Sequence, residues 1–344
     1  MSESNAQGRT QAWLALVNED VVDPAQRIVD PHHHLWDYRG SPGIAPVYLL
    51  DELHADTGSG HRVEATVFVE CGWAYRREGP EEFRQVGETE FVAAEAARSR
   101  ERTGQARIAA IVATCDLAMG PTLAAVLDAH EEAGDGLFVG IRHRLAFDPT
   151  DSARTGAAEP NVQGLMGTDE FRSGVALLGS RGLTFDAWLY HRQLPELVAM
   201  ARAVLGTTII LDHIGAPLGI GAYEGKWDEI HAQWRSDLAD LASCPNVVVK
   251  VGGIGMQTYG NGYHKLECPP TSDRIAADWG DELRFIIDTF GPSRCMFESN
   301  FPVDKVSFSY RVMWNAYKKV ASSYSPTDRD SLFAGTAERV YKIN

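Results

Sequence analysis

The chain has 344 residues, of which 44% are hydrophobic, and this length suits one large α/β barrel or two ordinary domains. Its formal net charge of −15 disfavours nucleic acids and anionic membranes as partners, so we expect a small-molecule partner. Five cysteines without a CxxC pair, no apolar run near the roughly 20 residues of a membrane span, and an N-terminus without a secretory pattern indicate a cytoplasmic protein.

Eight short apolar or β-branched runs follow one another along the chain and predict strands. They cover residues 27–32, 64–70, 107–113, 137–142, 183–190, 207–213, 246–251 and 294–299. Helical spacing of apolar residues predicts helices between them, over residues 90–102, 121–134, 169–182, 194–206, 227–243 and 281–291. A segment around residues 49–57 would supply the first crossover, and two more helices are predicted over residues 307–322 and 326–341.

The alternation of apolar strands with helices is typical of a parallel sheet covered on both faces. Eight such units close into a (β/α)8 barrel, the TIM-barrel fold, and we predict a single barrel domain over residues 27–344. Residues 1–26 are expected to pack outside the barrel, and the two helices after the eighth strand to complete its outer ring. A doubly wound open sheet is the structural alternative.

Polar side chains gather at the predicted carboxyl ends of the strands, where barrel enzymes hold their active sites. They are His32, His34, Glu70, Arg142, Tyr190, His191, His213, Lys250, Glu298 and Asn300. Each of them alone is compatible with a structural role. Their coincidence at so many strand ends indicates an active site.

The stretch VDPHHHLWD places three consecutive histidines at the end of the first predicted strand. Residues two apart in a strand point to the same side, so His32 and His34 can both face the barrel mouth while His33 points away. Two imidazoles on one side can chelate a single ion, and zinc suits imidazole ligands. His33 is interpreted as a packing or supporting residue.

Several segments resemble the amidohydrolase superfamily, specifically its amidohydrolase-2 branch of lactonase-like TIM-barrel hydrolases. They are the HxH pair, LDHIGAP around His213, RCMFESNFPVDK, FDAWLYHRQLPEL, NVVVKVGG and LFAGTAERVY. The resemblance covers almost the whole chain. It implies one divalent metal ion held by His32, His34 and a ligand from a later strand, for which His213 is the natural choice, or the same cradle working without metal.

The eighth strand departs from this resemblance. Many relatives carry an Asp there that binds metal and accepts a proton, whereas this chain has Asn300. A neutral amide cannot accept a proton near pH 7, so Asn300 is interpreted as a substrate contact and metal binding is expected to be weakened or absent. Glu298 is the candidate replacement base, with Asp304 as a second candidate. The structural alternative for Glu298 is an ion pair with Lys250 or Arg294.

Other residues near the predicted mouth are candidate substrate contacts. Arg142 is suited to a bidentate contact with a carboxylate, although an ion pair with Glu70 is an equal alternative. Trp188 and Tyr190 alternate along one strand and would share a face, as a binding wall or as packing. His191 is a candidate for polarising a carbonyl, and His264, in the long loop after the seventh strand, is a candidate for covering the substrate.

The sequence therefore predicts a hydrolase that opens a small and anionic lactone by metal- or histidine-assisted attack of water. Glu298, His213 and His191 are its predicted catalytic residues. Two alternatives stay open: a metal-dependent non-oxidative decarboxylase of an aromatic or enol acid, and a barrel that binds a ligand without catalysis. A homo-oligomer also stays open.

Overall fold

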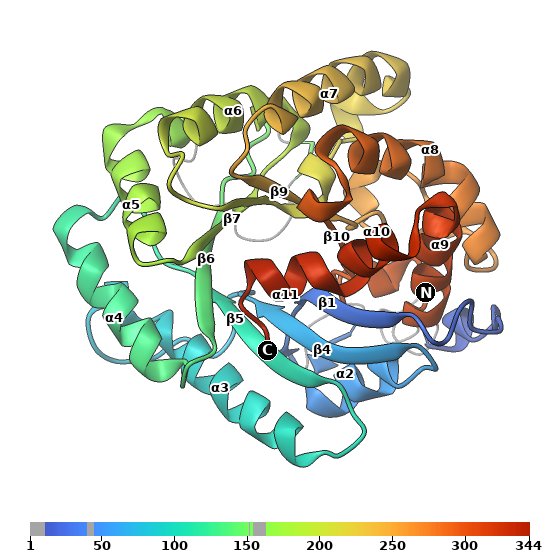
Figure 1. Ribbon diagram of the computed structural model, residues 1–344, viewed down its shortest axis with the longest axis horizontal. Coiled ribbons are helices and arrows are strands. Elements are labelled where there is room, and N and C mark those ends of the chain that lie inside the picture. Colours follow the sequence, from blue (N-terminus) through green and yellow to red (C-terminus); the bar gives the residue numbers. More distant parts are fainter. Residues whose placement is uncertain (1–10, 40–44, 151, 154–162) are drawn as a thin grey trace.

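Eight parallel strands form a ring surrounded by helices in the computed structural model, which describes residues 11–39, 45–150, 152–153 and 163–344 (Figure 1). Around the ring they are β1 (Arg27–His33), β4 (Arg62–Val69), β5 (Arg107–Ala113), β6 (Phe138–Arg144), β7 (Thr184–Trp188), β8 (Ile209–Leu211), β9 (Val247–Val251) and β10 (Cys295–Phe297). A parallel bridge between His33 and Phe301 closes the ring. All eight predicted strands and the barrel are confirmed, and the closure rules out an open sheet.

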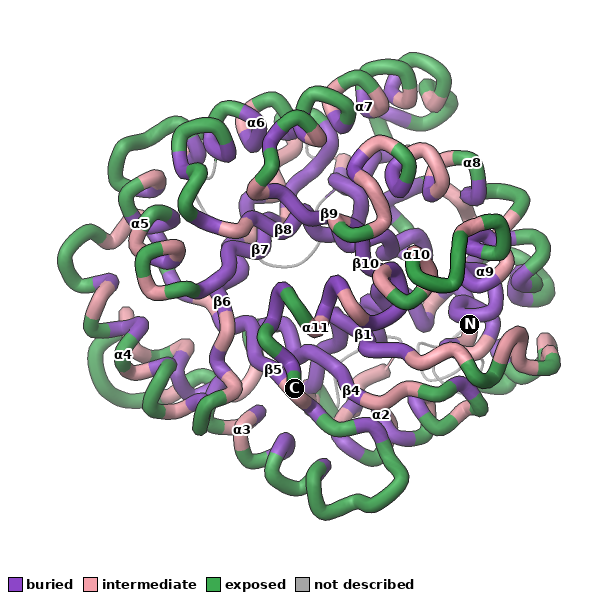
Figure 2. The backbone as a smooth tube through the Cα atoms, in the orientation of Figure 1, coloured by how far each residue is buried: buried purple, intermediate pink, exposed green. Residues whose placement is uncertain are grey.

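Helices cover the outside of the ring, with their buried sides toward the strands and their exposed sides toward solvent (Figure 2). They are α2 (Leu50–Thr57), α3 (Val86–Glu101), α4 (Leu123–Ala133), α5 (Asp169–Ser180), α6 (Leu194–Ala203), α7 (Trp227–Ala242), α8 (Ser272–Phe290) and α9 (Tyr310–Val320). Helix α8 begins well before residue 281, where the sequence predicted its start, because the Thr271 side chain accepts a hydrogen bond from the Arg274 amide and caps it. None of the described helices is both long and apolar enough to cross a bilayer.

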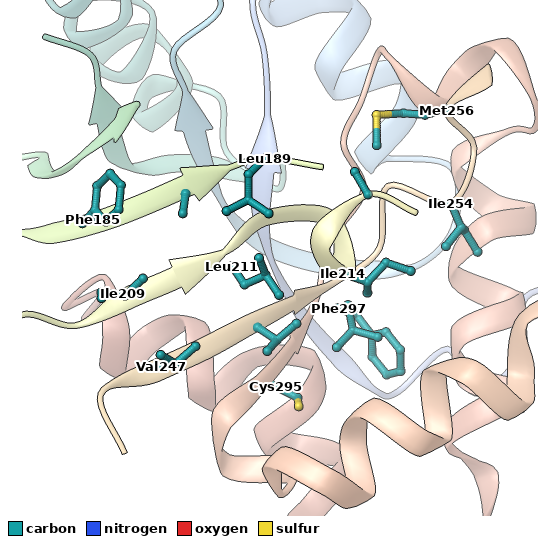
Figure 3. Packing of buried hydrophobic residues seen from close by; sticks show 14 of the residues in the cluster. Phe185, Leu189, Ile209, Leu211, Ile214, Val247, Ile254, Met256, Cys295 and Phe297 are labelled. Atoms are coloured by element: carbon teal, nitrogen blue, oxygen red, sulfur yellow. The ribbon is translucent and has the colours of Figure 1, made fainter. Parts of the chain in front are cut away.

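The strands have apolar side chains on both faces. Outward residues such as Phe185, Leu211 and Phe297 are buried in the layer between strands and helices (Figure 3). Inward residues such as Ile210 and Val248 belong to a second apolar cluster inside the barrel. Strands buried on both faces explain why the sequence shows apolar runs rather than alternation.

The predicted last helix, over residues 326–341, is corrected by the structure. It is divided into α10 (Pro326–Asp330), a π-helical turn (Ser331–Gly335) and α11 (Thr336–Val340). Helix α11 does not join the outer ring but lies across one end of the barrel (Figure 1), where Ala337 and Tyr341 pack in the inner cluster. Arg27, the first residue of β1, donates to Glu338, so α11 closes the end at which the strands begin. The opposite end stays available for the site.

The segment before β1 contacts α8 and the loop that precedes it. Trp13 donates its indole N–H to the Leu266 carbonyl, and Glu19 accepts from the Ser272 backbone at 2.8 Å. Residues 36–37 and 47–48 form the small hairpin β2 (Trp36–Asp37) and β3 (Val47–Tyr48) beside the barrel mouth. The division of the chain at residue 26 stays a prediction.

Candidate active site

Three histidines converge at the carboxyl ends of β1 and β8. The Nε2 atoms of His32 and His34 lie 3.3 Å apart, and the rings of His32 and His213 are 4.5 Å apart between centroids. Two nitrogen ligands of one tetrahedral zinc ion, each at 2.0–2.1 Å, would be about 3.3 Å apart. His33 lies on the other side of the chain and packs against Phe68, as the alternation along a strand requires.

Hydrogen bonds to Nδ1 leave the Nε2 atoms of two of these rings as electron-pair donors. His34 Nδ1 lies 2.8 Å from the Val69 carbonyl, which can only accept, so Nδ1 carries the proton. His213 Nδ1 lies 2.6 Å from Glu298 Oε1, an acceptor as a carboxylate. Burial lowers the pKa of all three imidazoles, to about 3 for His213, so they are neutral near pH 7. Neutral imidazoles are the form that binds metal.

Glu298 lies beneath the histidines rather than at the mouth. Its side chain is fully buried, Oε1 contacts His213 Nδ1, and Oε2 lies 2.9 Å from His32 Nδ1. Burial raises the pKa of Glu298, and the ammonium of Lys250 opposes this shift. Arg294, which was weighed as its partner, donates instead to backbone carbonyls, among them that of Phe290. Glu298 follows directly after the last residue of β10, Phe297, and its side chain points into the barrel. It is therefore not among the described residues that line the cavity at the mouth.

Asn300 does reach the cavity, in a left-handed conformation with φ of 53°. Its amide nitrogen donates to Asp304 Oδ1 at 2.8 Å, and Asp304 Oδ2 accepts from the Gly255 amide. The amide oxygen of Asn300 therefore points away from Asp304. An amide oxygen accepts a hydrogen bond without taking the proton, so Asn300 can orient a bound molecule but cannot deprotonate it.

Two arginines share one buried carboxylate. Arg142 and Arg144 lie two apart on β6, and each donates its Nε–H to Glu70 Oε1 at 2.8 Å. Burial opposes ionisation of Glu70, but the two guanidinium groups lower its pKa to about 2. The group therefore keeps one net positive charge. The alternative ion pair between Arg142 and Glu70 is present. Arg144 was not predicted, although the alternation in Arg142-His143-Arg144 places it on the same side of the strand.

A cavity of about 370 Å³ opens above these groups. It is lined by His34, Trp36, Cys71, Arg142, Arg144, Trp188, His213, Met256, Gln257, Thr258, Asn300, Val303 and Val306. The Trp188 ring meets that of His213 edge to face, with 4.9 Å between centroids. The cavity thus combines an apolar wall with imidazoles, two arginines and one amide.

Tyr190, His191 and His264, which the sequence predicted to contact the substrate, do not line this cavity. Tyr190 is buried and donates to the Ala153 carbonyl, and His191 Nδ1 accepts from the Leu218 amide in a separate groove. The strand β7 ends at Trp188, two residues before its predicted end, so the side chains that follow no longer alternate between the inside and the outside. His264, in a short 3-10 turn, is likewise absent from the lining.

The GGIG segment after β9 makes room for the site. A Cβ atom on Gly252, Gly253 or Gly255 would come within 2.4 to 2.8 Å of Glu298, His213 and Asp304, respectively. Real Cβ atoms essentially never approach so closely. The absence of a Cβ atom at these glycines therefore lets Glu298, His213 and Asp304 pack directly against the backbone. The sequence pattern alone does not indicate this role.

The donor set fits a divalent cation. His32, Asp212 and His213 each offer a ligand atom, and these atoms lie within 4.8 Å of one another. Asp212 is fully buried; Lys250 Nζ lies 3.0 Å from its Oδ1, and neither carboxylate oxygen accepts a hydrogen bond from a described residue. Buried carboxylate oxygens without hydrogen bonds are unusual in native proteins, and they mark Asp212 as a potential ligand. The residues present are thus suited to a metal of the zinc type.

Comparisons with known proteins agree with this geometry. The amidohydrolase family model matches residues 29–343. An uncharacterised protein of Sinorhizobium fredii is 32% identical over 92% of the chain and 98% of its own length, and an L-fucono-1,5-lactonase of Burkholderia multivorans is 29% identical over 92% and 96%. A crystal structure of a Burkholderia multivorans amidohydrolase with bound zinc is 27% identical, with a TM-score of 0.71 over 92% of this chain and 99% of the other.

Proposed function

Because the chain belongs to the amidohydrolase family, we propose that it is a hydrolase that opens the ring of a small lactone in the cavity above His34 and His213. The observation that carries the proposal is the convergence of three neutral imidazoles, of which His34 and His213 line a cavity that two arginines also line. The similarity to an L-fucono-1,5-lactonase supports a cyclic ester as substrate.

In the proposed reaction, water adds to the lactone carbonyl carbon, the ring C–O bond breaks, and the ring oxygen takes a proton to give a hydroxy acid. His213 faces the cavity, and its ring is held at Nδ1 by Glu298, so its Nε2 can meet the water or the carbonyl. Asn300 orients the bound molecule through its amide. His32, His34 and His213 would hold a divalent ion, which supplies Lewis acidity toward the carbonyl and toward water.

We further propose that the substrate carries an anionic group. Arg142 and Arg144 line the cavity and share the carboxylate of Glu70. Asp212 lies 3.9 Å from Arg142 but closer to Lys250, at 3.0 Å. A guanidinium group matches a carboxylate in two-point geometry. The excess positive charge thus favours a lactone with a carboxylate over a neutral one.

A panel of substrates tests the proposed function. We expect acid release, followed by a pH indicator, from lactones, and faster release from carboxylate-bearing lactones than from neutral sugar lactones of the same ring size. Carbon dioxide release from a parallel panel of aromatic carboxylic acids is expected to be absent. Carbon dioxide without acid release would identify a decarboxylase instead. Binding by calorimetry without turnover of either panel would leave a ligand-binding barrel.

We expect weak metal binding at the three histidines, because Asn300 contributes no negative charge where many relatives have a carboxylate. Dialysis against a mild chelator should remove zinc from the wild-type protein, as followed by elemental analysis. The Asn300→Asp variant should retain more zinc under the same conditions. A stoichiometric metal that resists removal from the wild type would contradict this expectation.

A further inference from the structure

A layer of charged side chains lies inside the barrel directly beneath the histidines. We call Asp186, Asp212, Lys250 and Glu298 the charged layer; all four side chains are fully buried. Asp212, Lys250 and Glu298 each lie two residues after an inward apolar residue, namely Ile210, Val248 and Met296. Side chains two apart in a strand point to the same side, so the charged layer follows the apolar layer along the barrel axis.

Lys250 provides the only ammonium of the charged layer. Its Nζ lies 2.7 Å from Asp186 Oδ2, 3.0 Å from Asp212 Oδ1 and 3.3 Å from His32 Nδ1. One cation therefore contacts two carboxylates and a candidate metal ligand at the same time.

The two carboxylates differ in their other partners. Asp186 Oδ2 also accepts from the Tyr341 hydroxyl at 2.6 Å, and Asp186 Oδ1 from the Thr184 hydroxyl at 3.2 Å. Asp212 has no such hydrogen bonds from described residues, and its other polar neighbours, His32 Nδ1 and an Arg142 guanidinium nitrogen, are 3.8 and 3.9 Å away. Asp212 thus has ion pairs but no hydrogen bonds, with Lys250 as its nearest cation, while Asp186 also accepts hydrogen bonds from two hydroxyl groups.

We propose that Lys250 neutralises Asp212 and thereby weakens the contribution of this carboxylate to a divalent ion at His32 and His213. An ion that shared Asp212 would lie close to the ammonium. A divalent ion and an ammonium roughly 5 Å apart, at an effective dielectric constant near 20, repel strongly enough to change a binding constant by at least about 100-fold. The inference rests on the proposed metal site and on no particular substrate.

The test is a zinc titration of the full chain after chelation, measured by calorimetry and by competition with a chromophoric chelator. The Lys250→Met variant keeps the apolar stem and removes the charge, and we expect it to bind zinc about 100-fold more tightly than the wild type. The double variant Lys250→Met with Asp212→Asn should lose most of this gain, because the gained ligand is the Asp212 carboxylate.

Lys318→Met is the matched control. Lys318 is also buried and also contacts a histidine, with its Nζ 2.8 Å from His61 Nδ1, but it lies outside the charged layer. Its removal should leave zinc affinity unchanged. If Lys250→Met does not fold, Lys250→Met combined with Asp186→Asn restores the charge balance, keeps Asp212 and should show the same gain.

Equal zinc affinity in the wild type and in the folded variants without Lys250 would overturn the inference. Full retention of the gain in the Asp212→Asn double variant would overturn the role of Asp212. If neither the wild type nor the variants bind zinc, the metal site itself fails, and the inference with it. Lactone hydrolysis by the metal-free wild type would then still support the proposed function, so the two failures can be distinguished.

Discussion

Replacing Glu298 with glutamine is expected to lower turnover by about 100-fold to 10,000-fold while the barrel stays folded. The carboxylate of Glu298 holds one oxygen on each of two imidazoles, His213 at 2.6 Å and His32 at 2.9 Å. An amide offers one oxygen and one NH2 group, so one of the two imidazoles would face a donor instead of an acceptor. That ring would lose the orientation that the site requires. Turnover of the best lactone and circular dichroism are the two measurements.

Asp56→Asn is the control for the Glu298 variant. Asp56 is a partly buried carboxylate, paired with Lys305 at 2.7 Å, and it does not line the catalytic cavity. We expect Asp56→Asn to lower stability and to leave turnover close to that of the wild type. If Glu298→Gln behaves in the same way, with lost stability and intact turnover, Glu298 is a structural residue only. Asp304, the second candidate base from the sequence, would then be the next carboxylate to replace.

The substitution Gly253→Ala is expected to cost about 3 kcal/mol or more of unfolding free energy and at least about 100-fold in turnover. Gly253 has φ of +70°, and a Cβ atom there would lie 2.6 Å from the His213 Cβ and 2.8 Å from its Nδ1. His213 must therefore move, and its contact with Glu298 would be lost. Chemical denaturation and turnover measure the two effects.

Gly136→Ala is the control that measures the cost of backbone strain without a collision. Gly136 has φ of +78°, close to that of Gly253, but a Cβ atom there would meet nothing within 4 Å. We expect it to lose about 1–2 kcal/mol, the cost of a left-handed conformation, and to keep full turnover. If both variants lose similar stability and Gly253→Ala keeps its turnover, His213 tolerates a Cβ atom at residue 253. The predicted collision would then be wrong.

The sequence predicted the strands well because each is a short apolar run buried on both faces, and such runs are distinct from helical spacing. It predicted the β8 run over residues 207–213, whereas the strand ends at Leu211. The cause is the left-handed turn at His213, which the apolar pattern does not encode. The last helix was placed in the outer ring because its apolar spacing does not specify which surface it covers.

Candidate site residues were predictable where a local pattern carried the information. The HxH pair follows from the two-residue period of a strand, and the same period would have indicated Arg144. The partners of Lys250 could not be predicted, because Asp186 lies 64 residues earlier in the chain and Tyr341 is 155 residues from Asp186. Likewise, the contacts of Glu298 depend on how strands at opposite ends of the sequence close the barrel.

Helix α11 makes the first and last parts of the barrel depend on each other. Arg27 and Glu338 are 311 residues apart in sequence yet form an ion pair, and Val29 shares the inner cluster with Tyr341. Bringing such distant segments together costs more chain entropy than any contact between neighbouring βα units. We therefore expect the contacts of α11 to form later in folding than those between successive βα units, and the inner cluster to be complete only once α11 has docked.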